Sequence, residues 1–102
     1  MANPLLKGLR PVHPGELLRE DVLPALGRPK TEIARLLGIS RQTLYDILNE
    51  RQPVTPAMAL RFARLLGGSP EVWLNMQRAY DLAIAERELG DALDAIPTLE
   101  AA

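Results

Sequence analysis

Apolar residues recur every three to four positions in five segments of the chain, and turn-forming residues separate these segments. This spacing is typical of amphipathic helices, and no stretch keeps the strict alternation that indicates a strand. We therefore expect an all-α protein. The expected helices run from Glu16 to Ala25 or Leu26, over 30–37, over 41–48, over 56–66 and, as the longest, from Pro70 to Leu89.

Hydroxyl residues and glycines mark the ends of these segments. Ser40, Thr55 and Ser69 each precede a helical pattern, where a hydroxyl accepts a hydrogen bond from a free backbone N–H group. A proline follows two of them, as is common at the first helical position. Gly38 and Gly90 come directly after the last apolar residue of a segment, where a glycine closes a helix at least cost.

The window from Lys30 to Asn49 carries the functional signal. Gly38, Ile39 and Ser40 make too tight a turn for parallel packing, so the two short helices must cross at a large angle, which is the helix-turn-helix arrangement. A purely structural corner between two helices is the alternative. Apolar residues fill the joint, with a small one at the point of close approach: Ile33, Ala34, Leu37, Ile39, Leu44 and Ile47.

Polar and basic side chains remain outside this joint, where a recognition helix meets base edges. An arginine bonds guanine bidentately, a glutamine does so with adenine, and the N–H groups of a helix start bind phosphate. The alternative for each residue is an ordinary solvated side chain. The expected DNA-binding residues lie at the start of the second helix of the motif, at the start of the first and in the loop that follows: Ser40, Arg41, Gln42, Thr43, Tyr45, Lys30, Thr31, Arg51 and Gln52.

Composition limits the other classes of function. The 102 residues are 47% hydrophobic, enough for one domain with a real core, and contain no cysteine, which excludes disulfides and thiolate metal sites. His13 is the only histidine and no nucleophile stands beside a base, so we expect no metal site, no cofactor and no enzyme activity. No apolar run approaches the roughly 20 residues of a membrane span. Residues 1–12 lack the apolar segment of a signal peptide, which favours a cytoplasmic protein.

Charge is distributed unevenly along the chain. The net charge of −1 by itself argues weakly against a nucleic-acid partner. Residues 1–64 carry ten Lys/Arg and six Asp/Glu, a balance of +4, whereas residues 65–102 carry two Arg and seven Asp/Glu, a balance of −5. This asymmetry predicts a basic surface for phosphates and a separate acidic region, unless the charges cluster by chance.

The longest helix has more apolar surface than one short core needs. One helix-turn-helix buries little DNA surface, so two copies are usually joined by a two-fold axis, with recognition helices about 34 Å apart on an inverted-repeat operator. Alternatively the apolar stripe is core, and the dimer forms elsewhere, for example through the residues 1–12. Whichever interface is used, we expect an N-terminal arm over 1–12, the helix-turn-helix domain over 13–90 and a flexible acidic tail over 91–102. The expected dimer interface comprises Trp73, Met76, Tyr80, Ala83 and Ile84.

Residues 13–90 closely resemble the HigA-type antitoxins of the Xre-like helix-turn-helix group. The resemblance rests on the stretches HPGELLREDVLPALG and KTEIARLLGISRQTLYDILNERQPVTPAMALRFARLLGGSPEVWLNMQRAYDLA. Within them, ISRQTLYDILN, PVTPAMALR and SPEVWLNMQ are far more specific than a bare helix-turn-helix pattern. The resemblance implies a five-helix, lambda-repressor-like fold.

The same resemblance implies partners. Members of this family form homodimers, bind palindromic sites in their own operon promoter and neutralise a partner of the HigB type, a RelE-like toxin that cleaves mRNA on the ribosome. Two alternatives stay open: a free-standing transcriptional regulator without a toxin, and a toxin-binding protein whose helix-turn-helix no longer binds DNA. Arg41, Gln42 and the basic N-terminal half argue against the latter. Only a neighbouring toxin gene separates an antitoxin from a free-standing regulator.

Overall fold

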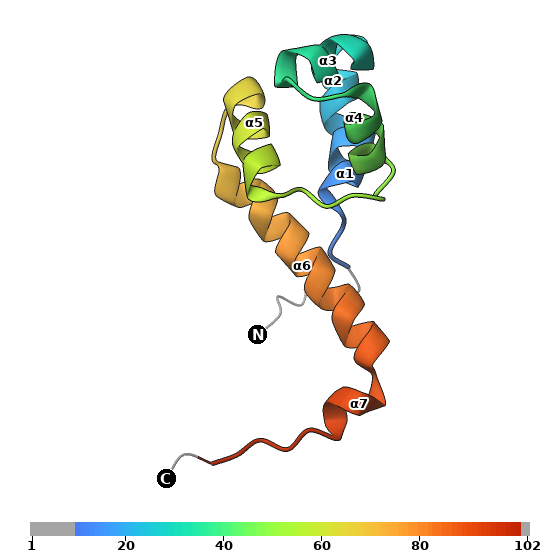
Figure 1. Cartoon of the computed structure of the whole chain (residues 1–102), viewed down its shortest axis with the longest axis vertical. Helices are drawn as coiled ribbons and strands as arrows, with labels where there is room; N and C mark the ends of the chain where they lie inside the picture. Colours follow the sequence, from blue (N-terminus) through green and yellow to red (C-terminus); the bar gives the residue numbers. More distant parts are fainter. Residues whose placement is uncertain (1–9, 101–102) are drawn as a thin grey trace.

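The computed structural model describes residues 10–100, and this part of the chain contains helices and irregular segments but no strand. The first three elements follow one another without a break, so residues 14–26 form one helix and the described residues form six in all (Figure 1). The five predicted helices are confirmed, and a short sixth lies in the tail. The elements are α1 (Pro14–Leu17), η2 (Leu18–Val22), α2 (Leu23–Leu26), α3 (Lys30–Leu37), α4 (Arg41–Leu48), α5 (Pro56–Leu66), α6 (Pro70–Leu89) and α7 (Asp91–Asp94).

The first helix contains a π-helical segment, η2, between its two α-helical ends. The N–H group of Leu23 donates to the carbonyl of Leu18, five residues back instead of four. Pro24 gives the physical reason, because proline has no N–H group to donate and its ring clashes with the carbonyl four residues earlier in a regular helix. The wider turn places Pro24 at the start of α2, where helices tolerate proline. The helix therefore continues past Pro24 and ends before Gly27, as predicted.

Side-chain caps begin the helices. The hydroxyls of Ser40, Thr55 and Ser69 accept hydrogen bonds from backbone N–H groups in the first turns of α4, α5 and α6, which confirms the three predicted caps. The first helix begins at Pro14, two residues before its predicted start. The reason is that the imidazole of His13 caps α1, a role that the sequence pattern did not indicate.

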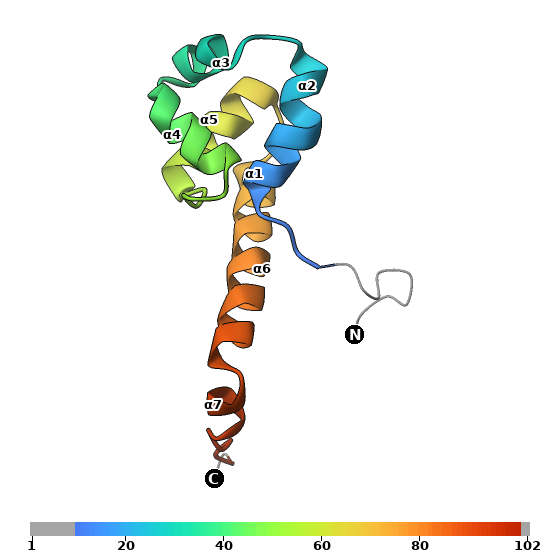
Figure 2. The ribbon, with the colours of Figure 1, turned by 90° about the vertical axis from the view of Figure 1, so that its right-hand side faces the viewer.

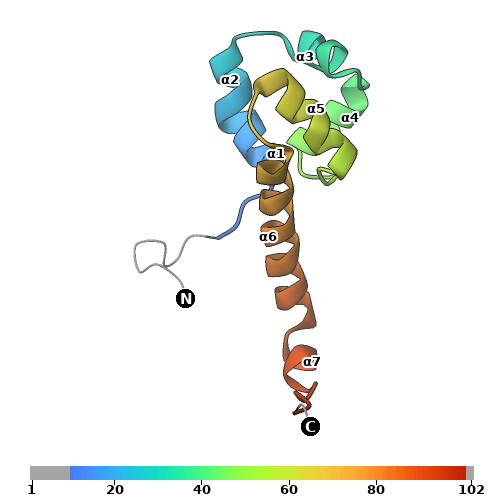
Figure 3. The same ribbon diagram turned by 90° about the vertical axis from the view of Figure 1, so that its left-hand side faces the viewer.

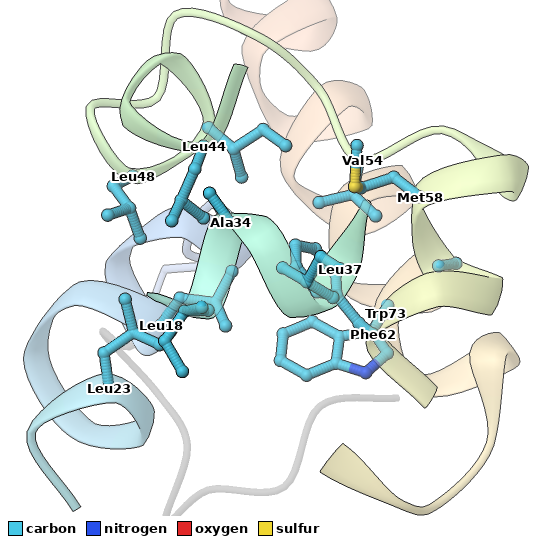
Figure 4. Close-up of a cluster of buried hydrophobic side chains, with 13 residues drawn as sticks. Leu18, Leu23, Ala34, Leu37, Leu44, Leu48, Val54, Met58, Phe62 and Trp73 are labelled. Carbon is cyan, nitrogen blue, oxygen red and sulfur yellow. The ribbon is translucent and has the colours of Figure 1, made fainter. Parts of the chain in front are cut away.

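The hydrophobic core is built around α3. Figure 4 shows Ala34 and Leu37 of this helix between leucines of the first helix and of α4 on one side and Phe62 of α5 on the other. The rings of Phe62 and Trp73 lie 5.2 Å apart, which joins the start of α6 to the same core. Burial of each large side chain stabilises the fold by about 1.5–3 kcal/mol. The buried hydrophobic residues are Leu18, Leu23, Ile33, Ala34, Leu37, Leu44, Ile47, Leu48, Val54, Met58, Ala59, Phe62 and Trp73.

Helix α6 leaves the head formed by α1 to α5 as a protruding rod (Figures 1, 2 and 3). The molecule measures 55 Å along its longest axis and 29 and 24 Å along the others. The buried residues of α6 are Trp73 and Gln77, both in its first half, and each residue from Ala85 to Glu100 is exposed. In residues 10–100 no helix has both the length and the apolarity that crossing a membrane requires.

The acidic tail contains one helical turn, α7, where the sequence predicted no regular structure. Gly90 separates it from α6, and the N–H group of Ala95 donates to the carbonyl of Asp91 over 3.1 Å. Figures 2 and 3 show α7 below the end of α6, away from the head. Leu93 and Ile96 remain exposed, so this part of the tail does not contribute to the core.

Candidate nucleic-acid interface

Helices α3 and α4 form the predicted corner. Gly38 takes the left-handed conformation (φ 74°), and the N–H group of Ile39 donates to the carbonyl of Ala34 over 3.0 Å, so the chain changes direction within three residues. Ala34 and Leu44 are both 1% exposed, and the small side chain of Ala34 leaves room for Leu44 of α4 to pack close to α3. This is the geometry of a helix-turn-helix.

The predicted DNA-binding residues lie at the surface of this corner. Arg41, Gln42 and Tyr45 are exposed on α4, the last with 38% of its surface accessible although it is aromatic. Thr43 is half-buried, and its hydroxyl accepts a hydrogen bond from that of Ser40 over 2.9 Å, next to the cap of α4. The remaining predicted residues are exposed apart from the half-buried last one: Lys30, Thr31, Arg51 and Gln52.

The beginnings of the two helices are favourable for phosphate. Free N–H groups give the start of a helix a partial positive charge, and the first turn of α4 contains Arg41 and no acidic residue. Lys30 begins α3. Glu32 lies in that same turn, but its carboxylate bonds to the guanidinium of Arg28 over 2.8 Å, which offsets its charge. The starts of α3 and α4 are therefore both favourable positions for an anion such as a phosphate.

Three side chains at this surface form a cluster centred on Asp46. One of its carboxylate oxygens, Oδ1, accepts a hydrogen bond from the Nε2 of Gln42 over 2.8 Å. The same oxygen accepts a second from the guanidinium of Arg51 over 3.2 Å. Gln42 and Arg51 are predicted DNA-binding residues, whereas Asp46 is not, because sequence reasoning singles out basic and amide side chains for DNA.

Two further arginines hold the corner from outside the motif. A guanidinium nitrogen of Arg61, on α5, donates to the carbonyl of Leu37 over 2.7 Å, at the end of α3. The guanidinium of Arg19, on the first helix, donates to the carbonyl of Leu48 over 2.6 Å, at the end of α4, and pairs with Glu50 at 3.3 Å. The last carbonyls of a helix lack partners within it, so each arginine satisfies such a group and attaches the end of the helix to its neighbour.

Buried polar side chains connect α6 to the head. His13, which is 3% exposed, accepts the N–H group of Gly15 at its Nδ1 (2.9 Å) and meets the ring of Tyr80 edge-on at 5.1 Å. Burial lowers the pKa of His13, and the nearby carboxylates of Glu50 and Asp81 oppose this shift only partly. The histidine is therefore favoured in its neutral form, in which Nδ1 can accept.

Gln77 is the second of these buried polar residues. Its Oε1 accepts the N–H group of Val54 over 2.8 Å, in the loop that follows α4, and its Nε2 donates to Asp81 over 2.9 Å. Gln77 thus supplies the hydrogen-bond acceptor for a backbone N–H group of this loop. Through this bond α6 helps to hold the loop that contains Arg51. Nothing in the local pattern predicted this role. The signal in the sequence is an amide four residues after Trp73, on the face that Trp73 buries.

The predicted dimer residues divide into two groups. Trp73 is 7% exposed and packs on Phe62, so it belongs to the core of the single chain. The other four residues are half-buried, and Tyr80 contacts His13. The alternative interface is the arm over 1–12. Most of this arm, residues 1–9, lies outside the described residues. The half-buried residues are Met76, Tyr80, Ala83 and Ile84.

Known helix-turn-helix proteins match both the sequence and the fold. A family model described as helix-turn-helix matches residues 18–73. Virulence-associated protein I of Dichelobacter nodosus is 42% identical over 77 residues, which make up 76% of this chain and 71% of that protein. Antitoxin HigA-1 of Vibrio cholerae serotype O1 is 37% identical over 73 residues, 72% of this chain and 68% of that protein. The solved structure of antitoxin GraA in complex with its operator is 41% identical, covers 99% of both chains and has a TM-score of 0.83.

The corner, the core around α3 and these matches define a DNA-binding helix-turn-helix protein with the lambda-repressor-like fold. The chain belongs to the Xre-like helix-turn-helix family and, within it, to the HigA-type antitoxins. The resemblance inferred from the sequence is thereby confirmed. HigA-1 and GraA are named as antitoxins and not as enzymes.

Proposed function

We propose that this chain binds an inverted-repeat operator as a homodimer, represses its own operon and neutralises a RelE-like toxin of the HigB type. The observation that carries the proposal is the exposed start of α4, which presents Arg41 and Gln42 without an acidic residue in that turn, on a corner fixed by Arg19 and Arg61. GraA, which has the same fold over nearly its whole length, was solved on its operator. In the proposed complex this chain uses the corner in the same way.

Arg41 and Lys30 have different functions in the proposed complex. Arg41 reaches base edges, so Arg41→Ala should weaken specific binding by about 1–3 kcal/mol and relax the base preference at one position of each half-site. Lys30 contacts phosphate, so Lys30→Ala should weaken binding to all sequences evenly and reduce the salt dependence. Fluorescence anisotropy with the chain's own promoter, at several salt concentrations, measures both effects. If Arg41→Ala and Gln42→Ala both kept wild-type affinity, α4 would not be the recognition helix.

The proposed dimer joins two copies of α6. Helix α6 protrudes from the head (Figure 1), and Ile84 is half-buried in its second half, so Ile84→Arg should give a folded monomer. Glu86→Arg is the control, because two residues along a helix correspond to about 200° and place that charge on the opposite face. Sedimentation measures the mass of each variant, and circular dichroism its fold. A wild-type monomer at micromolar concentration would contradict the preformed dimer, and a dimeric Ile84→Arg would exclude this helix as the interface.

The toxin partner is tested at the level of the operon. A short open reading frame next to this gene, encoding a RelE-like protein, should arrest growth when expressed alone, and co-expression of this chain should restore growth. The two proteins should then co-purify. If no such reading frame adjoins the gene, or if the two products do not associate, the chain is a free-standing regulator of the same DNA-binding class.

A further inference from the structure

Asp46 is an acidic side chain at a surface that is otherwise suited to DNA. It is the only acidic residue of α4, and it lies one turn beyond Gln42 on the same face of the helix. A carboxylate at a DNA-binding surface is repelled by phosphates, which lowers affinity for every sequence. Its two hydrogen bonds, to Gln42 at 2.8 Å and to Arg51 at 3.2 Å, indicate what it does in return.

The first of these bonds restricts the chemistry that Gln42 can offer. An ionised carboxylate only accepts hydrogen bonds, so the group of Gln42 that faces Asp46 must be the amide nitrogen. One of its two amide protons is then occupied. The side chain presents one remaining N–H donor and its carbonyl acceptor, Oε1, to any further partner.

This donor–acceptor pair matches adenine and not guanine. In the major groove adenine presents the N7 acceptor beside the N6 amino donor, whereas guanine presents two acceptors, N7 and O6. A glutamine with both amide protons free can turn its NH₂ group toward both guanine acceptors. A glutamine whose amide is held by Asp46 has one proton left and meets the second guanine acceptor with its own carbonyl oxygen, which is repulsive.

We propose that Asp46 is a specificity-determining residue: it positions the amide of Gln42 so that α4 selects adenine over guanine at one position of each half-site. This inference rests on the proposed DNA-binding function. Arg51 shares the same carboxylate oxygen and reduces the repulsion between Asp46 and phosphate. Asp46 therefore has two effects on DNA binding. As a hydrogen-bond acceptor it orients the amide of Gln42, and as a negative charge it repels phosphate.

Two substitutions distinguish these effects. Asp46→Ala removes both the acceptor and the charge, whereas Asp46→Asn removes the charge, keeps one acceptor oxygen for Gln42 and replaces the other oxygen by an NH₂ donor. Asp94→Ala removes one carboxylate from α7, far from α4, and is the matched control for net charge (Figure 1). A bond between Gln42 and Asp46 that served only to stabilise the helix would change the melting temperature but not the base preference.

The experiment selects binding sites for the full chain from duplexes of about 30 base pairs with a randomised centre, long enough for two half-sites. Wild type and Asp94→Ala should enrich adenine at the position that becomes indifferent in Gln42→Ala. Asp46→Ala should reduce the adenine-to-guanine ratio there about tenfold, the range expected for one bidentate contact. Asp46→Asn should keep the ratio within about twofold and bind all duplexes more tightly. Thermal melting verifies that each variant is folded.

Three results would overturn the proposal. The first is an unchanged adenine-to-guanine ratio in Asp46→Ala, and the second is a loss of the ratio in Asp46→Asn as large as in Asp46→Ala. The third is a Gln42→Ala variant with an unaltered preference at every position, because Gln42 would then read no base. None of these contradicts DNA binding by the corner itself, which Arg41→Ala and Lys30→Ala test separately.

Discussion

A side chain at Gly15 would collide with the backbone of α4. A Cβ atom placed there would lie 1.9 Å from the carbonyl oxygen of Ile47 and 2.9 Å from its carbonyl carbon. Both are backbone atoms of α4, and Ile47 is completely buried, so neither can turn away as a flexible side chain would. Restoring an ordinary contact of 3.4 Å requires α1 and α4 to move apart by about 1.5 Å.

We therefore expect Gly15→Ala to destabilise the fold substantially. Overpacking of a rigid interior costs about 1–3 kcal/mol, and a backbone clash belongs at the upper end of that range. The better helix propensity of alanine offsets at most about 1 kcal/mol of this cost, so the free energy of unfolding should fall by about 2 kcal/mol. For a domain of this size the melting temperature should fall by about 8–16 °C, which scanning calorimetry measures. Operator affinity should fall as well, because the displaced α4 carries Arg41.

Gly27→Ala is the comparison for this prediction. Gly27 also rejects a side chain, but only through its left-handed backbone (φ 65°), since nothing lies within 4 Å of a Cβ atom there. The substitution Gly27→Ala should lower the free energy of unfolding by about 1 kcal/mol and leave operator affinity unchanged. If Gly15→Ala melted at or above the temperature of Gly27→Ala, the close approach of α1 and α4 would not limit the packing of the head.

Three further predictions concern His13, Arg61 and the tail. Because burial lowers the pKa of His13 below its ordinary value of 6.5, the unfolded chain takes up a proton that the folded chain resists, and stability should fall as the pH drops below about 6.5. His13→Asn, which can still cap α1, should remove this part of the pH dependence in urea unfolding. Arg61→Ala should lower the melting temperature by about 4–8 °C, because it loses the hydrogen bond at the end of α3, worth about 1 kcal/mol, whereas the same truncation at Arg64, three residues later on α5, should not. Deletion of 91–102 should shift the melting temperature by no more than a few degrees, because the described part of the tail is exposed; a larger shift would show that it docks on the core.

Local signals in the sequence predicted most helix ends and the corner, because a cap or a left-handed glycine acts within a few residues of itself. Ser40 and Gly38 are examples. Arg19, Arg61 and Gln77 instead bond to main-chain atoms 29, 24 and 23 residues away, and nothing near them in the sequence indicates those partners. Such contacts depend on how the helices pack, which a single helical pattern does not contain.

Trp73 shows the same limit for the apolar stripe of α6. Helical spacing shows that one face of a helix avoids water, but it does not show what covers that face. Trp73 is covered by the chain's own α5, through Phe62, whereas the second half of α6 extends beyond the head. The difference arises from the length of α6 relative to the head, a property of the assembled fold.

Helix α4 packs against the core and presents a polar surface through different residues. Leu44, Ile47 and Leu48 are buried, whereas Arg41 and Gln42 are exposed. Substitutions of exposed residues away from special features usually change stability by less than about 0.5 kcal/mol. In the proposed complex the preferred operator can therefore drift during evolution while the fold is conserved. If Arg41 and Gln42 read the operator as proposed, several copies of such a gene in one genome can avoid crosstalk between their promoters by altering a few surface side chains, without any change to the core.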